Sequence, residues 1–325
     1  MGYITKYGTV WGAIPQTSGR VFWVAPSASY TVEGRTYSAS DQNDGLSPER
    51  ALLTLAQAML SVTANVGDVI VLLPGTHTMA ATVAVNIAGI TITGIPQNMS
   101  TYAPRMASGG AAMRTTVTAA ASTDAINVTA VDVELANLHF VAVSAQNSVK
   151  ASNAADRLFI HDCTWDMYTA ADSTATVAIN LGASGTGTTT TIDNVHIRNC
   201  YFLVSGAKGA AVSASNTAIG TIIENSTFQL GLASATAWAT AIMLGSSVHQ
   251  GTVIRDCDVL CTATGTAVTR FVDANIATTD GSTIMYRCNV PAGCIGLDAT
   301  ATADAIIVDS YTAGTTGTNT VIATT

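Results

Sequence analysis

One short phrase recurs seven times in the second half of the chain, and it limits the possible folds more than any other feature. The first copy is VELANLHFVA at 133–142 and the last is AIIVDSYTAG at 305–314, with LFIHDCTWDM, VHIRNCYFLV, TIIENSTFQL, TVIRDCDVLC and TIMYRCNVPA between them. Successive copies lie 25, 37, 26, 31, 31 and 22 residues apart. A repeat of this size indicates stacked supersecondary units rather than one closed globule.

Four columns of the aligned copies have distinct chemical characters. The first is aliphatic and contains Leu135, Ile160, Ile197, Ile223, Ile254, Met285 and Ile307. Two residues later comes a column that is almost entirely Asn or Asp, with Asn137, Asp162, Asn199, Asn225, Asp256, Arg287 and Asp309. The next column is mostly small and holds Leu138, Cys163, Cys200, Ser226, Cys257, Cys288 and Ser310. Two positions further on lie the aromatic residues Phe140, Trp165, Phe202 and Phe228.

These columns predict a strand, a turn and a second strand in every copy. Apolar residues that alternate with polar ones are typical of a half-buried strand. Asn and Asp tolerate left-handed backbone geometry, so their column marks a sharp bend. Nothing between the copies is typical of a helix long enough to cross a sheet. The sequence therefore predicts an all-β solenoid, in which identical columns stack on themselves from coil to coil at a spacing of ~4.8 Å.

The repeat resembles that of the right-handed parallel β-helices of the pectate-lyase-like superfamily, over roughly residues 37–314. The opening strings SASDQNDGLSPERALLTLAQAMLSV and GDVIVLLPGTHT are similar to the start of many such domains. The resemblance implies a short amphipathic helix that covers the N-terminal end of the solenoid. Within the superfamily, the chain is most similar to β-helix structural proteins of tailed-phage virions. The fold alone does not determine the function, because it carries lyases, hydrolases, adhesins and virus spikes.

The expected organisation has three parts. Residues 1–36 form an N-terminal arm for attachment or oligomerisation, 37–66 a turn and the capping helix, and 67–325 the β-helix with a C-terminal cap or tail. Ser47 is the expected N-cap of the helix and Pro48 its first residue. An apolar stripe at helical spacing follows, made of Leu52, Leu55, Ala56, Met59 and Leu60.

The arm is rich in aromatic residues although the chain as a whole contains only 6% of them. We consider its side chains, with one from a later loop, as a candidate interface: Tyr3, Tyr7, Trp11, Phe22, Trp23 and Trp238. An arm of this length is too short for a core of its own. It either packs along its own solenoid, threads into a neighbouring subunit or docks onto a larger particle.

Composition favours an assembled structural protein. Charged residues make up 10% of the chain, against ~25% in typical soluble domains, which predicts a surface covered by neighbouring subunits. The net charge of −8 argues against nucleic acid as a partner. No apolar run is long enough to span a membrane, and the N-terminus lacks the features of a signal peptide.

Cysteine spacing predicts free thiols and no metal site. Cys163, Cys200, Cys257 and Cys288 share one inward column, which is typical of small buried side chains that pack in a core. No C-x-x-C pair or other metal-ligand spacing is present. We therefore expect no metal and no cofactor.

Two sets of residues could carry catalysis. The column before the Asn/Asp position contains His161, Arg198, Glu224, Arg255 and Tyr286, which form either a catalytic strip or simple cross-strand charge pairs. The second set is two pairs of acids, Asp162 with Asp166 and Asp256 with Asp258, as in a glycoside hydrolase. Asp162 and Asp256 already have a role in the turn column, and the hydrolase and lyase motifs of the superfamily are absent. The sequence therefore predicts no catalytic residues.

The first functional hypothesis is a non-catalytic structural protein of a bacteriophage virion, namely a trimeric capsid decoration protein assembled in the host cytoplasm. Its expected partners are two further copies of the chain and a capsid protein, with a surface glycan as a further candidate. One alternative is a tailspike that binds a host surface glycan. Another is a polysaccharide lyase or glycoside hydrolase. A bacterial adhesin is the third.

Overall fold

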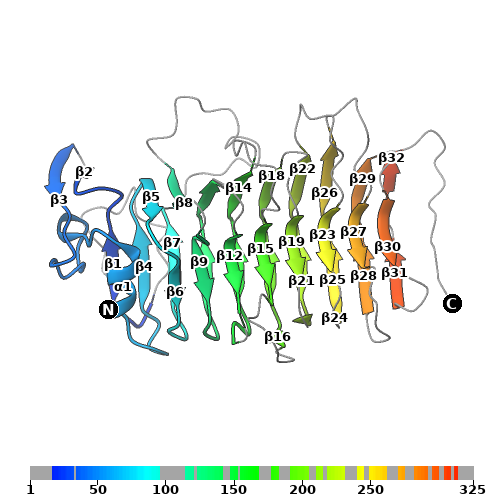
Figure 1. Cartoon of the computed structure of the whole chain (residues 1–325), viewed down its shortest axis with the longest axis horizontal. Coiled ribbons are helices and arrows are strands. Elements are labelled where there is room, and N and C mark those ends of the chain that lie inside the picture. Colours follow the sequence, from blue (N-terminus) through cyan, green and yellow to red (C-terminus); the bar gives the residue numbers. More distant parts are fainter. Residues whose placement is uncertain are drawn as a thin grey trace.

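The computed structural model is a right-handed parallel β-helix whose strands stack along one long axis (Figure 1). It describes residues 17–32, 34–95, 114–120, 123–141, 147–152, 154–167, 177–182, 191–204, 210–214, 218–230, 240–244, 249–261, 270–274, 282–291, 295–299, 304–308 and 311–313. Among these residues, no helix is long and apolar enough to cross a membrane. The predicted fold class is confirmed.

Three long parallel sheets form the walls of the solenoid. The first sheet has ten strands: β1 (Val21–Val24), β4 (Val69–Leu72), β7 (Thr91–Gly94), β10 (Glu134–Ala136), β13 (Phe159–His161), β17 (His196–Arg198), β21 (Ile222–Glu224), β25 (Thr252–Arg255), β28 (Ser282–Tyr286) and β31 (Asp304–Val308). The second has nine: β5 (Gly75–Met79), β8 (Thr115–Ala119), β11 (His139–Val141), β14 (Thr164–Met167), β18 (Tyr201–Val204), β22 (Thr227–Leu230), β26 (Asp258–Cys261), β29 (Asn289–Pro291) and β32 (Tyr311–Ala313). The third has eight: β6 (Val83–Val85), β9 (Ile126–Val128), β12 (Asn147–Ala151), β15 (Val177–Leu181), β19 (Ala210–Ala214), β23 (Thr240–Leu244), β27 (Arg270–Ala274) and β30 (Ile295–Ala299).

Each coil passes through the first, second and third sheets in turn, as β10, β11 and β12 do. A small three-stranded sheet lies at the corner before the first sheet and contains β16 (Ile192–Asp193), β20 (Ala218–Ile219) and β24 (His249–Gln250). An antiparallel hairpin of β2 (Ser29–Val32) and β3 (Arg35–Ser38) precedes the second coil. The strands of Figure 1 therefore advance by one coil at a time along the axis.

The aliphatic and aromatic columns lie in register inside the solenoid. Ile160 pairs with Ile197, and Ile197 with Ile223, which in turn pairs with Ile254. Phe140, Trp165, Phe202 and Phe228 follow one another on the second sheet, with ring centroids 5.2, 4.7 and 4.9 Å apart and nearly parallel planes. All of these side chains are almost completely buried. Stacked rings of this kind contribute beyond the area that they bury.

The cysteine column lies in the same core. Cys163, Cys200, Cys257 and Cys288 are free thiols and are buried. Burial raises the pKa of the Cys163 thiol to about 12. Ser226 occupies the same column, where its hydroxyl donates to the Glu224 carbonyl at 2.8 Å. These side chains are therefore packing groups that donate hydrogen bonds to backbone carbonyls.

The Asn/Asp column forms the corner between the first and second sheets. Asn137, Asp162, Asn199, Asn225 and Asp256 have φ between 49° and 54°, and Arg287 has φ 49°. Their backbone N–H groups continue the ladder to the next coil, as from Asp162 to the Arg198 carbonyl at 3.2 Å. Their side chains are half-buried or exposed. The column is therefore set by backbone geometry at an outer corner, where Asn and Asp accept left-handed φ best. Asp309 lies outside the described residues.

A second left-handed corner lies between the third and first sheets. It contains Asp132, Arg157, Asn194, Gly220 and Gly251, with φ between 56° and 67°. Arg157 donates two hydrogen bonds to Asp132 of the preceding coil, at 2.6 and 2.7 Å. These residues share a backbone conformation but no side-chain type, so the sequence did not predict this corner.

The N-terminal end differs from the expected arm. β1, which falls within residues 1–36, pairs in parallel with β4 and so belongs to the solenoid. Phe22 and Trp23 on this strand are 2% and 5% exposed. They pack in the core, so the prediction of an interface is wrong for these two residues. Tyr3, Tyr7, Trp11 and Trp238 lie outside the described residues.

The capping helix is shorter and starts later than expected. Pro48–Arg50 form a single 3₁₀ turn, and α1 spans Leu55–Ser61 with Thr54 as its N-cap, whose hydroxyl accepts from Gln57 N–H at 3.1 Å. Between them, Leu52 forms a bridge with Val24 and covers the free edge of β1. Leu55 and Met59 of α1 are buried but Leu60 is 80% exposed. The backbone of Leu52 thus pairs with β1, and this pairing interrupts the predicted helix.

Candidate functional site

The outer face of the first sheet carries the densest group of ionisable side chains. Because strand residues alternate in direction, the two positions beside each aliphatic core residue point outward. We call the charged and aromatic outward residues from β10 to β25 the outer strip: Glu134, Phe159, His161, His196, Arg198, Glu224 and Arg255. His161, Arg198, Glu224 and Arg255 occupy one register column, as the sequence predicted. Glu134, Phe159 and His196 form the other.

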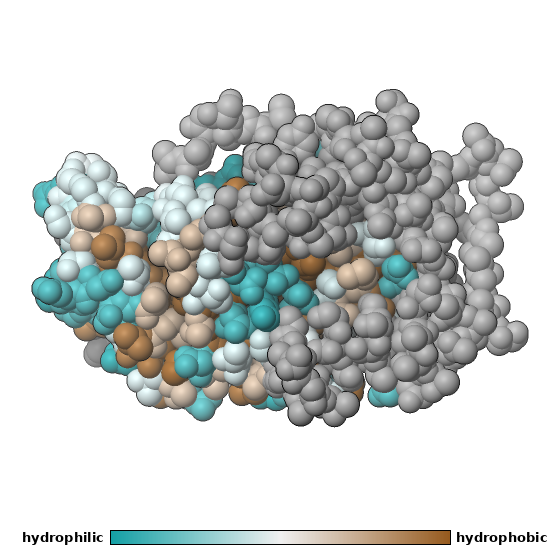
Figure 2. All heavy atoms as spheres, viewed as in Figure 1, coloured by the Kyte–Doolittle hydropathy of each residue, from teal (hydrophilic) through white to brown (hydrophobic). Residues whose placement is uncertain are grey.

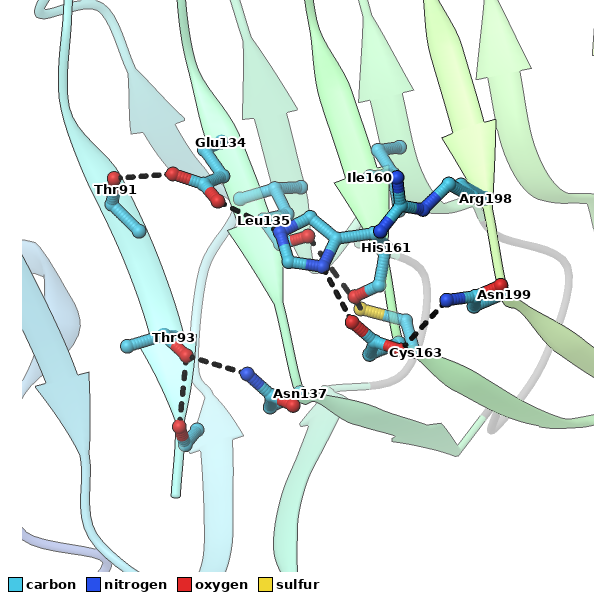
Figure 3. A network of polar contacts seen from close by, with 12 residues as sticks. Thr91, Thr93, Glu134, Leu135, Asn137, Ile160, His161, Cys163, Arg198 and Asn199 are labelled. Carbon is cyan, nitrogen blue, oxygen red and sulfur yellow. Dashed lines mark hydrogen bonds and ion pairs between the residues drawn. The ribbon is translucent and has the colours of Figure 1, made fainter. Parts of the chain in front are cut away.

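His161 lies at the centre of a continuous network (Figure 3). Its Nε2 lies 2.7 Å from Glu134 Oε1 and its Nδ1 lies 2.7 Å from Asp162 Oδ2. The network extends at both ends, because Thr91 donates to Glu134 at 2.7 Å and Asn199 donates to Asp162 at 3.3 Å. Both imidazole nitrogens therefore face carboxylates, an arrangement that needs a proton on each nitrogen.

The charged form of each group in this network is stabilised by its neighbours of opposite charge. Burial opposes a charge on His161, but the hydrogen bonds to Asp162 and Glu134 outweigh it and raise the pKa of the imidazole to about 9. The same imidazole lowers the pKa of the Glu134 carboxyl and of the Asp162 carboxyl. At neutral pH the group is thus an imidazolium between two carboxylates.

We expect the stability of the protein to depend on this imidazolium. Its pKa in the folded state, about 9, lies above the ordinary value of 6.5, so its contribution is complete below that ordinary value and is lost as pH rises through the folded value. Replacing His161 by Gln should lower the free energy of unfolding by about 1–3 kcal/mol at pH ~6, and by much less at pH ~10. Urea unfolding of both proteins at the two pH values measures this difference. An equal difference at both would contradict the imidazolium assignment.

A second cluster lies one coil further on. His196 Nε2 lies 2.9 Å from Glu224 Oε1, and Arg255 Nε donates to Glu224 Oε2 at 2.6 Å. Burial of Glu224 acts against its charge, but the hydrogen bonds from Arg255 and His196 outweigh it and lower the pKa of this carboxyl. An ionised carboxylate only accepts, so Nε2 of His196 carries the hydrogen and, in the neutral ring, Nδ1 has a free lone pair. The His196 side chain is 32% exposed.

An aromatic ring connects the two clusters. Phe159 lies between His161 and His196, at ring-centroid distances of 4.4 and 5.0 Å with interplanar angles of 27° and 26°. The Arg198 guanidinium lies 6.0 Å from the centre of the same ring. Arg198 is exposed and makes no hydrogen bond or ion pair through its side chain with the described residues. It is thus a cation available to a ligand.

The predicted pairs of acids do not come together. Asp162 lies in the outer corner, whereas Asp166 lies on β14 of the second sheet. Asp256 accepts two hydrogen bonds from Arg287, at 2.7 and 2.8 Å, while Asp258 begins β26. Among the described residues, no three His, Cys, Asp or Glu side chains are placed as metal ligands would be.

Sequence reasoning missed Glu134, Phe159 and His196. They belong to the position just before each aliphatic residue, which a strand period of two also places outward. In this position Glu134 and His196 alternate with Phe159, Ile222 and Val253, so no regular charge pattern marks it in the sequence. The signal that could have revealed it is the strand period, which makes both neighbours of each aliphatic residue outward.

Sequence comparisons give no family. No protein-family model matches the chain, and no curated protein matches it. Solved structures do match it in fold. A pectin methylesterase in complex with a hexasaccharide aligns with a TM-score of 0.56 and 13% identity, covering 88% of this chain and 92% of that one.

Two further structures are similar to the same degree. A pectin methylesterase from Erwinia chrysanthemi has a TM-score of 0.51 and 12% identity, over 94% of this chain and 92% of that one. An alginate lyase from a Paenibacillus species has a TM-score of 0.50 and 12% identity, over 80% of this chain and 96% of that one.

These comparisons contradict the hypothesis of a non-catalytic capsid decoration protein. The solved structures described above are pectin methylesterases and an alginate lyase, and none of the comparisons supports a likeness to phage virion proteins. The hypothesis relied on a low-charge surface, but several of the charges that are present gather on the outer strip. What the likeness establishes is the fold: this chain is a right-handed parallel β-helix.

Proposed function

We propose that this protein binds an acidic polysaccharide along the outer strip and cleaves it by β-elimination. One observation carries the proposal: His196, oriented by Glu224, stands on the same strand as the unpaired Arg198. The two side chains point outward two residues apart, which is roughly 6.6 Å along a strand. A base and a cation at this separation suit a sugar that carries a carboxylate.

His196 supplies the base. Its Nε2–H donates to Glu224, so the free lone pair of Nδ1 can accept a proton from a bound substrate. Glu224 also stabilises the imidazolium that forms when the proton is taken. Arg255 holds the other oxygen of Glu224 at 2.6 Å and so fixes the orientation of the pair.

Arg198 supplies the cation. A proton next to a carboxylate is acidic enough to be removed only when the negative charge of that carboxylate is neutralised. The exposed guanidinium of Arg198 makes no salt bridge with the described residues, although its charge helps to lower the pKa of the Asp162 carboxyl. It can form a two-pronged pair with a uronic acid. Phe159 beside it offers a flat apolar surface to the face of a sugar ring.

The proposed step balances without a cofactor. Nδ1 of His196 takes the proton from the carbon next to the sugar carboxylate, and the released electron pair forms a carbon–carbon double bond. The bond from the neighbouring carbon to the glycosidic oxygen breaks, and that oxygen takes a proton from water. The hydroxide that remains takes the proton from the His196 imidazolium and restores the base. The products are a new reducing end and an unsaturated uronate.

The charge states of the strip favour elimination over hydrolysis. Glycoside hydrolases need a protonated carboxyl that gives its proton to the leaving oxygen. Glu134, Asp162 and Glu224 all have a lowered pKa and are ionised at neutral pH. The similarity in fold to an alginate lyase and to a pectin methylesterase bound to a hexasaccharide supports a polysaccharide substrate.

The test is to incubate the purified protein with polygalacturonate, with alginate and with dextran, a neutral control. We expect ultraviolet absorbance from the unsaturated product to rise with at least one acidic polymer and not with dextran. New reducing ends without this absorbance would identify a hydrolase instead. No cleavage of either acidic polymer would overturn the proposed reaction.

A further inference from the structure

On the outer face of the first sheet, one register column becomes apolar after His196. The column that contains Glu134, Phe159 and His196 continues in register as Ile222, Val253 and Ile284. We call these three residues the apolar stripe. Ile284 is 37% exposed, and Ile222 and Val253 are half-buried. Outward positions of a solvated sheet are normally polar, so a row of β-branched residues here needs an explanation.

Two glycines occupy the corner beside the apolar stripe. Gly220 and Gly251 precede the stripe residues Ile222 and Val253 by two positions. In the preceding coils this corner carries the side chains of Asp132, Arg157 and Asn194 instead. A Cβ added at Gly251 would meet nothing closer than 3.9 Å, whereas one added at Gly220 would meet Asn194 Oδ1 at 2.8 Å. Among the described residues, the corner beside Val253 is therefore open to a long ligand.

The other side of the stripe is polar and bears cations. Arg255 follows Val253 by two residues and is exposed, while it holds Glu224. Tyr286 follows Ile284 in the same way, with the Arg287 guanidinium 4.4 Å from the centre of its ring. Arg287 also donates two hydrogen bonds to Asp256, so both guanidinium groups have a carboxylate partner and keep further N–H donors for a ligand. An apolar row beside such donors matches a polymer that has apolar ring faces and acidic substituents.

The stripe is also continuous with the site. His196 pairs directly with Ile222, so the stripe begins one coil after the proposed base. From His196 to Ile284 there are three coil steps, or roughly 14 Å at the usual strand spacing. We infer that the apolar stripe is an extended subsite, where the apolar faces of acidic sugar residues beyond the cleavage point pack. This inference rests on the proposed function.

Its test compares oligosaccharides of different lengths. Oligouronides from two to six units are titrated by calorimetry into His196→Gln, which leaves the ligand intact, with and without Val253→Thr and Ile284→Thr. Threonine keeps the β-branched shape and removes most of the apolar contact. The double change should weaken binding of the longest oligomers about 5- to 10-fold and leave binding of the dimer unchanged. Leu46→Thr, at an exposed apolar residue of the N-terminal end, is the matched control.

The outcomes separate the two proposals. If the wild type cleaves an acidic polymer but the stripe variants bind all lengths as before, or bind all lengths equally weakly, the subsite inference fails and the proposed function stands. If the wild type is a dimer or trimer that Ile284→Thr dissociates, the stripe is a protein interface and the inference is also wrong. If the wild type neither cleaves nor binds any acidic oligomer, both proposals fail.

Discussion

Replacing His196 by Gln should lower kcat on the acidic polymer that the wild type cleaves by about 10²–10⁴-fold. The Gln amide can still donate to Glu224, so the position of the side chain is kept while the base is lost. His196 is part-exposed and outside the core, so the free energy of unfolding should change little. Initial rates of double-bond formation, with urea unfolding of the same samples, measure both quantities.

The control for this prediction is Arg50→Gln. The Arg50 side chain is 66% exposed and pairs with Asp44 at 2.9 Å, in the segment between β3 and α1 and outside the outer strip. The Arg50→Gln substitution removes a charged, exposed side chain outside the site. The kcat of this variant should therefore equal that of the wild type. A His196→Gln protein with full activity would show that another group is the base.

Replacing Phe202 by Ala should destabilise the protein by about 3–5 kcal/mol. Phe202 is completely buried and lies between Trp165 and Phe228, with ring centroids at 4.7 and 4.9 Å. The change leaves a cavity and removes two stacked contacts at once. Chemical unfolding followed by the fluorescence of Trp165 reports on the affected coils directly.

Phe159→Ala provides the comparison on the outer face. Phe159 is half-buried and contacts His161 and His196 rather than the core, so its loss should cost about 1 kcal/mol. An equal loss of stability in the two variants would mean that the internal aromatic column is not the main support of the coils. Because each coil contacts mainly its neighbours, Phe202→Ala should also broaden the unfolding transition.

The sequence predicts best those parts of the fold in which one backbone conformation is adopted by one kind of residue. The left-handed corner selects Asn and Asp in copy after copy, so Asn199 and Asn225 reveal it. The other corner uses Asp132, Arg157 and Gly220 for the same backbone angle. No single residue type marks it, and alignment by composition does not find it.

The N-terminal end was harder to predict because pairing competes with local propensity. Ser47 and Pro48 are a good helix start, yet they begin only a short 3₁₀ turn. The backbone of Leu52 is used instead to pair with Val24, which protects the edge of β1. In the sequence, Phe22 and Trp23 are typical of an interface. The pairing of β1 with β4 makes them core residues instead.

The site could be predicted only in part. His161, Arg198, Glu224 and Arg255 were found as one column, but their partners come from different coils. Whether Glu224 pairs with His196 depends on the register between β17 and β21, which the repeat gives, and on rotamers, which it does not. Low overall charge was interpreted as a sign of assembly, although a few charges gathered on one face are enough for a site.

The corner between the first and second sheets has one more property, which concerns how this protein can change. From β10 to β29 it always contains two residues, such as 137–138, 199–200 and 287–288. The chain between the second and third sheets varies instead, from three residues between β29 and β30 to nine between β14 and β15. Insertions accepted there leave the distance from His196 to Ile284 untouched. Loops could therefore be lengthened, by evolution or by an engineer, to alter what reaches this face while the spacing of its side chains stays the same.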